Sequence, residues 1–145
     1  MFVDADGKKR IWSIKNGAPY VDGKSKGWSD APPVARSSPP VAVLTGERTG
    51  SAGEAVVVAF RGRPHTRSFG EPTYGVPTGN EAYRLSDAAL LNLTEVKDAD
   101  RTGRTYDEAI PPDEEIVKNP LARDRDDVLR AAQDWLLKQS ACARP

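Results

Sequence analysis

The chain has 145 residues, which is one domain's worth of sequence and enough to bury a hydrophobic core. Its 21 basic and 21 acidic residues give zero net charge, which argues against binding to nucleic acid or to an anionic membrane, since both need a clustered positive excess. The single cysteine, Cys142, excludes an internal disulfide framework, and one histidine adds no evident metal-ligand cluster. We therefore expect neither a metal nor another cofactor.

The first 39 residues are predicted to form β-hairpins followed by a connector. Asp6-Gly7 and Asn16-Gly17 are turn dipeptides on either side of an alternating run. Residues 29–40 form a Pro/Ser connector that cannot pair within a sheet, because its prolines lack the N–H that the strand ladder needs. The N-terminus has no apolar signal region, and the longest apolar run, residues 55–60, is too short to span a bilayer, so we expect no membrane partner.

The remaining residues, 40–140, are predicted to form a mixed α/β unit. Aliphatic residues at 40–46 indicate a buried, parallel strand, and 51–61 is predicted to be helical. The further elements that we expect are a strand around 66–69, a Gly/Pro loop to residue 80, antiparallel strands at 81–86 and 89–96, and an amphipathic helix over 125–139. This order lacks the full set of alternating units that a doubly wound fold needs.

Ser51 lies where the first predicted strand gives way to the first helix. With Glu54 three residues later it fits a capping box, in which each residue bonds the backbone of the other. The same geometry suits a catalytic alcohol, because the N–H of Ala52 would lie unpaired at the helix N-terminus, where an oxyanion can form. From spacing alone, both the structural and the catalytic interpretation stay open.

Later segments resemble one family of peptidases. In order, the matching pieces are ERTGSAGE, FRGRP, FGEPTYG, YRLSDAALLNLT, DRTGRTYDEAIPPDEEI and DDVLRAAQDWL, within residues 36–138. The series closely resembles the tail-specific protease (C-terminal processing peptidase) family, especially its tricorn-like branch. The resemblance implies a ClpP/crotonase-like α/β fold with sheet and helices, serine-type proteolysis without a metal, and a peptide or protein as substrate.

The resemblance also implies roles for individual residues. Ser51 corresponds to the nucleophile, and the amide of Ala52 to one oxyanion donor. A glutamate completes the catalytic set in the tricorn-like branch; Asp107 and Glu108 occupy that neighbourhood, and we favour Glu108. Ala109 stands where the family has a glycine.

Departures from the family pattern concern the general base. Val76 occupies the position of the lysine that serves as base in one branch, and it cannot accept a proton. His65, the single histidine, follows Ser51, whereas the tricorn-like base precedes the nucleophile; we expect a solvated turn residue. In the family, the second oxyanion donor comes from a segment upstream of the nucleophile, and no segment of that kind lies between Met1 and Ser51.

We therefore expect a partial copy of the peptidase catalytic domain, weak or inactive alone, that pairs with a missing N-terminal half or forms a homo-oligomer. The alternative is a non-catalytic remnant of the fold that binds peptides or other partners.

Overall fold

The computed structural model describes residues 2–4, 6–15, 18–27, 38–117 and 126–142. Two helices and eleven strands are formed within these residues. The strands are β1 (Phe2–Asp4), β2 (Lys9–Arg10), β3 (Trp12–Lys15), β4 (Ala18–Val21), β5 (Lys24–Ser25), β6 (Val41–Thr45), β7 (Thr66–Gly70), β8 (Thr78–Arg84), β9 (Leu90–Ala99), β10 (Thr105–Tyr106) and β11 (Glu114–Glu115); the helices are α1 (Ala52–Phe60) and α2 (Asp127–Leu137).

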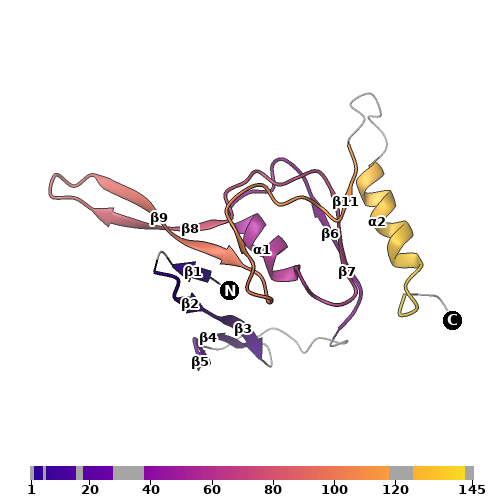
Figure 1. Cartoon of the computed structure of the whole chain (residues 1–145), viewed down its shortest axis with the longest axis horizontal. Coiled ribbons are helices and arrows are strands. Elements are labelled where there is room, and N and C mark those ends of the chain that lie inside the picture. Colours follow the sequence, from indigo (N-terminus) through magenta and orange to yellow (C-terminus); the bar gives the residue numbers. More distant parts are fainter. Residues whose placement is uncertain (1, 5, 16–17, 28–37, 118–125, 143–145) are drawn as a thin grey trace.

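A parallel sheet in the order β11-β7-β6 separates the two helices (Figure 1). Successive side chains of a strand point to opposite faces, and β6 shows the consequence. Val43 packs with Val57 and Val58 of α1, whereas Ala42 packs with Phe69 and α2 on the other face. The predicted parallel strand at 40–46 is thus confirmed, although it is partly rather than fully buried.

Helix α2 closes the outer face of this sheet. Its Val128 and Ala132 are buried against Phe69, and the ring of Trp135 lies 5.8 Å from the Phe69 ring. The helix begins where Asp126 accepts a hydrogen bond from the Leu129 amide at 2.9 Å, which satisfies one N–H that the first turn leaves free. The amphipathic helix predicted for the C-terminal segment is confirmed.

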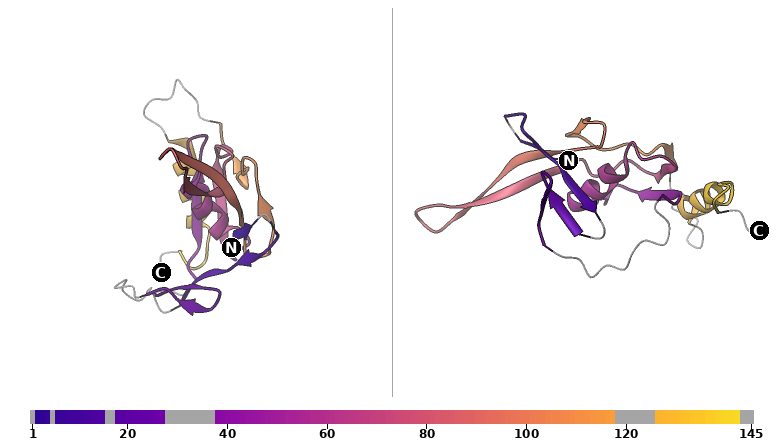
Figure 2. Two further views of the ribbon diagram at one scale, coloured as in Figure 1. Left: turned by 90° about the vertical axis from the view of Figure 1, so that its left-hand side faces the viewer. Right: turned by 90° about the horizontal axis from the view of Figure 1, so that it is seen from below.

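A second, antiparallel sheet carries a long hairpin away from the helices. Strands β8 and β9 pair from Thr78↔Lys97 to Arg84↔Leu90, and their outer parts extend beyond the rest of the molecule (Figure 2). The inner end of β9 pairs with β1 and β10, and Asp98 and Ala99 are buried there. The hairpin was expected from the sequence, but its attachment to residues 2–4 was not.

The N-terminal residues form two small antiparallel units, as predicted. Strands β1 and β2 pair around a turn in which Gly7 has φ 76°, and β3, β4 and β5 make a separate sheet. The turn between β4 and β5 uses Asp22 and Gly23, both with positive φ. The dipeptide 16–17 and most of the predicted connector lie outside the described residues.

The overall class is mixed α/β, as expected. Within the part of the chain that the structure describes, neither helix is long enough or apolar enough to cross a bilayer.

Candidate functional site

Ser51 lies at the junction between the carboxyl end of β6 and the first turn of α1. The connecting loop is tight because Thr49 N–H donates to Gly46 O at 2.8 Å while Gly46 N–H donates to the Thr49 hydroxyl at 3.2 Å. Helix α1 then begins with Ala52, and the side chain of Ser51 is exposed to solvent. A hydroxyl at the edge of a sheet and the start of a helix is accessible to a ligand from outside.

The backbone of Ser51 is strained. Its φ is 50° and its ψ is −114°, a conformation that residues with a side chain rarely adopt and that costs about 1–3 kcal/mol. An ordinary N-cap residue has extended backbone angles and needs no such strain. In the α/β-hydrolases, a serine on a sharp, strained strand-to-helix turn presents its exposed hydroxyl as the nucleophile. The strain therefore favours a functional interpretation of this serine over a purely structural one.

The buried carboxyl group of Glu54 holds this turn in place. Its Oε2 accepts from Ser51 N–H at 2.8 Å and from Val76 N–H at 2.9 Å. Its Oε1 accepts from the Thr73 hydroxyl at 2.5 Å and from Gly75 N–H at 2.8 Å. The bond from Ser51 N–H to Glu54 is the one that the predicted capping box requires of Glu54, but the other three donors come from the loop after β7.

That loop lies directly against the Ser51 turn. Tyr74 N–H donates to Thr49 O at 2.8 Å, and a Cβ added to Gly50 would lie only 3.3 Å from the Cβ of Tyr74. Any larger residue in place of Gly50 would push the loop away. Backbone and side-chain contacts together thus fix residues 73–76 beside Ser51.

The helix N-terminus offers one free donor. Ala52 N–H has no hydrogen-bond partner among the described residues, whereas Gly53 N–H donates to Gly50 O at 2.9 Å. Free amides at a helix N-terminus favour developing negative charge. The position and freedom of the Ala52 amide match those expected of an oxyanion donor.

The segment with Asp107 and Glu108 reaches the same loop. Ile110 N–H donates to the Thr73 hydroxyl at 2.8 Å, and Thr73 N–H returns a bond to Ile110 O at 3.2 Å. A Cβ on Gly75 would lie 3.0 Å from the backbone nitrogen of Ala109. Residues 108–110 are therefore brought close to the loop that flanks Ser51.

The two acidic side chains differ in their surroundings. Asp107 forms an ion pair with Lys97 at 2.6 Å, and the hydrogen bond and charge of Lys97 lower the pKa of Asp107. Glu108 is exposed and has no partner among the described residues. Glu108 is accordingly the more available of the two, although no direct contact with Ser51 is formed.

His65 lies far from Ser51. It occupies an exposed turn with φ 54°, and its carbonyl accepts from Val41 N–H at the start of β6. Because β6 and β7 run parallel over five residue pairs, His65 and the Ser51 turn lie at opposite ends of the sheet, about 15 Å apart along the strands. The expectation of a solvated turn histidine is confirmed.

Val76 offers no proton acceptor either, since its amide donates to Glu54 and its side chain is a partly exposed aliphatic group. The described residues also contain no cluster of three potential metal ligands.

The surface around Ser51 is open. A shallow depression is lined by Glu47 and Arg48 of the turn and by Thr73 and Tyr74 of the neighbouring loop. The side chain of Tyr74 is 71% exposed. The hairpins within the described residues leave Ser51 exposed, so an extended ligand can approach it.

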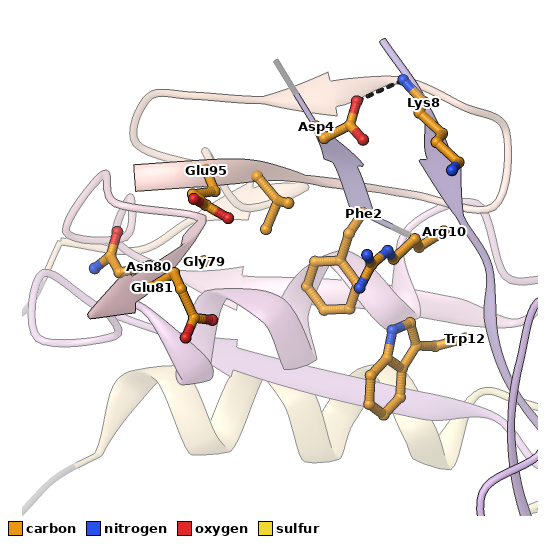
Figure 3. Close-up of a pocket in the computed structure, with 10 residues that line it drawn as sticks. Phe2, Asp4, Lys8, Arg10, Trp12, Gly79, Asn80, Glu81 and Glu95 are labelled. Carbon is orange, nitrogen blue, oxygen red and sulfur yellow. Dashed lines mark hydrogen bonds between the residues drawn. The ribbon is translucent and has the colours of Figure 1, made fainter. Parts of the chain in front are cut away.

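A separate cavity of about 300 Å³ lies on the antiparallel sheet, between the N-terminal hairpin and the base of the long hairpin. Figure 3 shows basic side chains, Lys8 and Arg10, on one side and the carboxylates of Glu81 and Glu95 on the other. None of the candidate catalytic residues lines it.

Sequence reasoning missed the part that Thr73 plays, although it singled out the loop. Thr73 is buried and joins Glu54 to the backbone of Ile110. The available signal was the composition of this segment, in which Thr73 follows Pro72 and lies between Gly70 and Gly75. Such a segment forms turns that leave several backbone amides free to donate hydrogen bonds.

Comparison with known proteins identifies the family. The sequence model of peptidase family S41 matches residues 3–116. The nisin-resistance protein of Lactococcus lactis subsp. lactis is 30% identical over 105 residues, which are 72% of this chain and 32% of that protein. The chloroplastic carboxyl-terminal-processing peptidase 2 of Arabidopsis thaliana is 33% identical over 101 residues, 59% of this chain and 20% of that protein.

Solved structures agree with this fold. The structure of a lipoprotein from Streptococcus agalactiae matches with a TM-score of 0.60 and 26% sequence identity. The match covers 93% of this chain and 42% of the lipoprotein chain. A Parabacteroides merdae protein assigned as a peptidase has a TM-score of 0.58 at 23% identity, with coverage of 88% and 39%. The chain thus spans about a third or less of the length of the curated relatives it matches.

Proposed function

Since the chain belongs to peptidase family S41, we propose that it carries the nucleophilic part of a serine-type peptidase site, with Ser51 as the nucleophile. The observation that carries the proposal is the strained turn at Ser51, with φ 50° and ψ −114°, together with an exposed side chain and a free amide on the next residue. Strain of this kind persists only where the surrounding structure over-determines it, as the four bonds to Glu54 do here.

In the proposed reaction, the Ser51 hydroxyl oxygen attacks the carbonyl carbon of a peptide bond while its proton passes to a base. The carbonyl oxygen becomes an oxyanion that accepts a hydrogen bond from Ala52 N–H. One such donor is worth about 10²–10³ in rate. Collapse of the tetrahedral intermediate releases the amine with that proton and leaves an acyl-serine, which water then hydrolyses.

The described residues provide no base near Ser51, because His65 lies at the other end of the sheet. We infer that the base belongs to a polypeptide segment that packs beside α1, either from a longer form of this chain or from a second subunit. In this scheme Glu108 orients that base, and Glu54 positions Ser51 without touching the substrate.

The proposal also includes a ClpP/crotonase-like fold for residues 40–140. Parallel strands with helices on both faces, and a separate antiparallel sheet that carries a long hairpin, are consistent with residues 40–140 being the C-terminal part of a ClpP/crotonase-like catalytic domain of the tricorn-like branch. The coverage of the relatives, a third or less, supports a partial copy.

A second candidate function is peptide binding without turnover. The distance between His65 and Ser51 favours it for the chain on its own, since a serine hydroxyl without a base is a poor nucleophile at neutral pH. The open surface around Ser51 would still accept an extended peptide.

One acylation experiment separates the two functions. The chain is treated with p-nitrophenyl acetate with and without imidazole as an external base, and acetylated serines are identified by peptide mass spectrometry. We expect Ser51 to be acetylated at least about tenfold faster than Ser86, an exposed serine of the hairpin turn, because only Ser51 has an oxyanion donor beside it. Imidazole should increase the rate at Ser51 further.

The control variants are Ser51→Ala, which should lose the adduct, and Ser86→Ala, which should keep it. Equal acetylation of the two serines would refute the nucleophile assignment. If peptides also bound equally well to the Ser51→Ala variant, the non-catalytic function would stand.

A further inference from the structure

One oxygen of the Asp98 carboxyl group is buried without a hydrogen bond. Asp98 lies near the inner end of β9, is 3% exposed, and has an Oδ2 atom with no hydrogen bond among the described residues. By contrast, both carboxyl oxygens of Asp100, two residues later, accept hydrogen bonds. The donors belong to Thr102, Arg104 and Tyr106. A buried polar atom without a partner is destabilising and calls for an explanation.

Asp98 lines a groove of about 710 Å³. One wall is the face of α1 formed by Ala55, Val58 and Ala59, which lie at helical spacing. The opposite wall is aromatic and comes from β1 and β3: the rings of Phe2 and Trp12 lie 5.9 Å apart, edge to face (Figure 3). The groove is therefore mainly apolar, and its lining includes one carboxyl group whose Oδ2 atom has no hydrogen bond.

The other charged residue of the lining does not neutralise Asp98. Arg101 donates to Ala59 O at 2.8 Å and to Arg61 O at 3.2 Å, at the carboxyl end of α1. No ion pair joins Arg101 and Asp98 in the part of the chain that the structure describes. Arg101 therefore leaves the Oδ2 atom of Asp98 without a hydrogen bond.

We propose that this groove binds a lysine or arginine side chain of a polypeptide, with the cationic head on Asp98 and the aliphatic stem between α1 and the aromatic wall. Such side chains bury their stems on apolar surfaces while their charge meets a polar partner. A charge-assisted hydrogen bond would satisfy the orphan oxygen, and the rings of Phe2 and Trp12 add an attraction for cations.

The electrostatics of the empty groove agree with this occupant. Burial is the largest influence and raises the pKa of Asp98; the positive charge of the chain's N-terminal amine lowers this pKa, and the charge of Glu54 adds a smaller rise. A bound cation stabilises the ionised form, so the complex recovers the interaction that the empty groove lacks. An anionic or purely apolar occupant would leave the carboxyl group unpaired.

Binding in the groove does not depend on the proposed chemistry of Ser51. None of the candidate catalytic residues lines the groove, so the two proposals can fail separately.

The test compares two peptides that differ only in charge: acetyl-Leu-Lys-Leu-amide and acetyl-Leu-norleucine-Leu-amide. Binding to the full chain is followed by NMR through the amides of Ala55, Ala59 and Ala99. We expect the lysine peptide to bind at least about tenfold more tightly, because a hydrogen bond to a charged group discriminates by that much or more. Asp98→Asn should abolish the preference.

Asp134→Asn, on the exposed side of α2, and Ser51→Ala should both keep the preference. A measurement on the unaltered chain guards against misfolding of the Asp98 variant: the carboxyl carbon resonance of Asp98 should shift with the lysine peptide and not with its neutral counterpart. Equal affinities, an unchanged preference in Asp98→Asn, or no shift at Asp98 would overturn the proposal.

Discussion

Replacing Glu54 with glutamine tests the organisation of the candidate site. The carboxyl group accepts four hydrogen bonds, two at each oxygen, and it is completely buried. Glutamine keeps one acceptor oxygen and places an amide donor where the other was. Whichever way the amide turns, at least one backbone N–H, that of Gly75 or those of Ser51 and Val76, faces a donor instead of an acceptor.

The cost follows from the number of donors that lose their acceptor. Each buried N–H left unsatisfied costs about 1–3 kcal/mol. In the less costly orientation of the glutamine amide, Gly75 N–H loses its acceptor. The Thr73 hydroxyl must also reorient, although its oxygen already accepts a hydrogen bond from Ile110 N–H. We therefore expect Glu54→Gln to lower the free energy of unfolding by about 3 kcal/mol, a large part of the 5–15 kcal/mol that is typical of a domain.

Urea unfolding followed by far-UV circular dichroism measures this change, and hydrogen exchange locates it. The amides of Ser51, Gly75 and Val76 should exchange faster in the variant. Glu115→Gln is the matched control, because Glu115 is exposed in the short strand β11. If the two variants differed by less than about 0.5 kcal/mol, the size expected of surface substitutions, the hydrogen bonds of Glu54 would not be what holds the turn.

Three further changes test other parts of the structure. Ser51→Gly should raise the free energy of unfolding by about 1 kcal/mol by relieving the positive φ, as measured by urea unfolding; no gain relative to Ser51→Ala would contradict the strain. Gly70→Ala should prevent stable folding or cost about 4 kcal/mol or more, because its Cβ would lie 2.1 Å from Thr45 O; an unchanged melting temperature would be incompatible with this contact. For Asp113, burial acts in the opposite direction, but hydrogen bonds from the Ser68 N–H and hydroxyl lower its pKa. Its ionised form therefore stabilises the fold above the usual aspartate range and loses this effect as the pH falls. Asp113→Asn should thus be less stable near pH 7 and equal to the unaltered chain near pH 2, and a constant difference across a pH series would be evidence against this linkage.

The elements that depend on neighbouring residues were predictable. Helix α1, the parallel strands β6 and β7, the β8–β9 hairpin and helix α2 all follow from apolar periodicity, turn dipeptides and capping residues. The sequence also led to the family, through the order of its motifs, and the match over residues 3–116 confirms it. These signals lie within a few residues of the positions they determine.

Short strands were not predictable, because their pairing comes from distant residues. Strands β10 and β11 have two residues each, too few to show an alternation, and they form because β9 and β7 offer free edges. The same holds for β1, whose partner β9 lies more than ninety residues later in the chain.

The candidate site divides in the same way. The sequence by itself determined that Ser51 precedes a helix, that Glu54 can return a bond to it, and that the Ala52 amide is free, since all three depend on one helical turn. Only the tertiary structure decided that Glu54 is saturated by a loop some twenty residues away, that His65 lies at the opposite end of the sheet, and that one oxygen of Asp98 is buried without a hydrogen bond. The physical reason is that hydrogen-bond saturation and desolvation depend on which distant backbone groups and apolar surfaces surround a side chain.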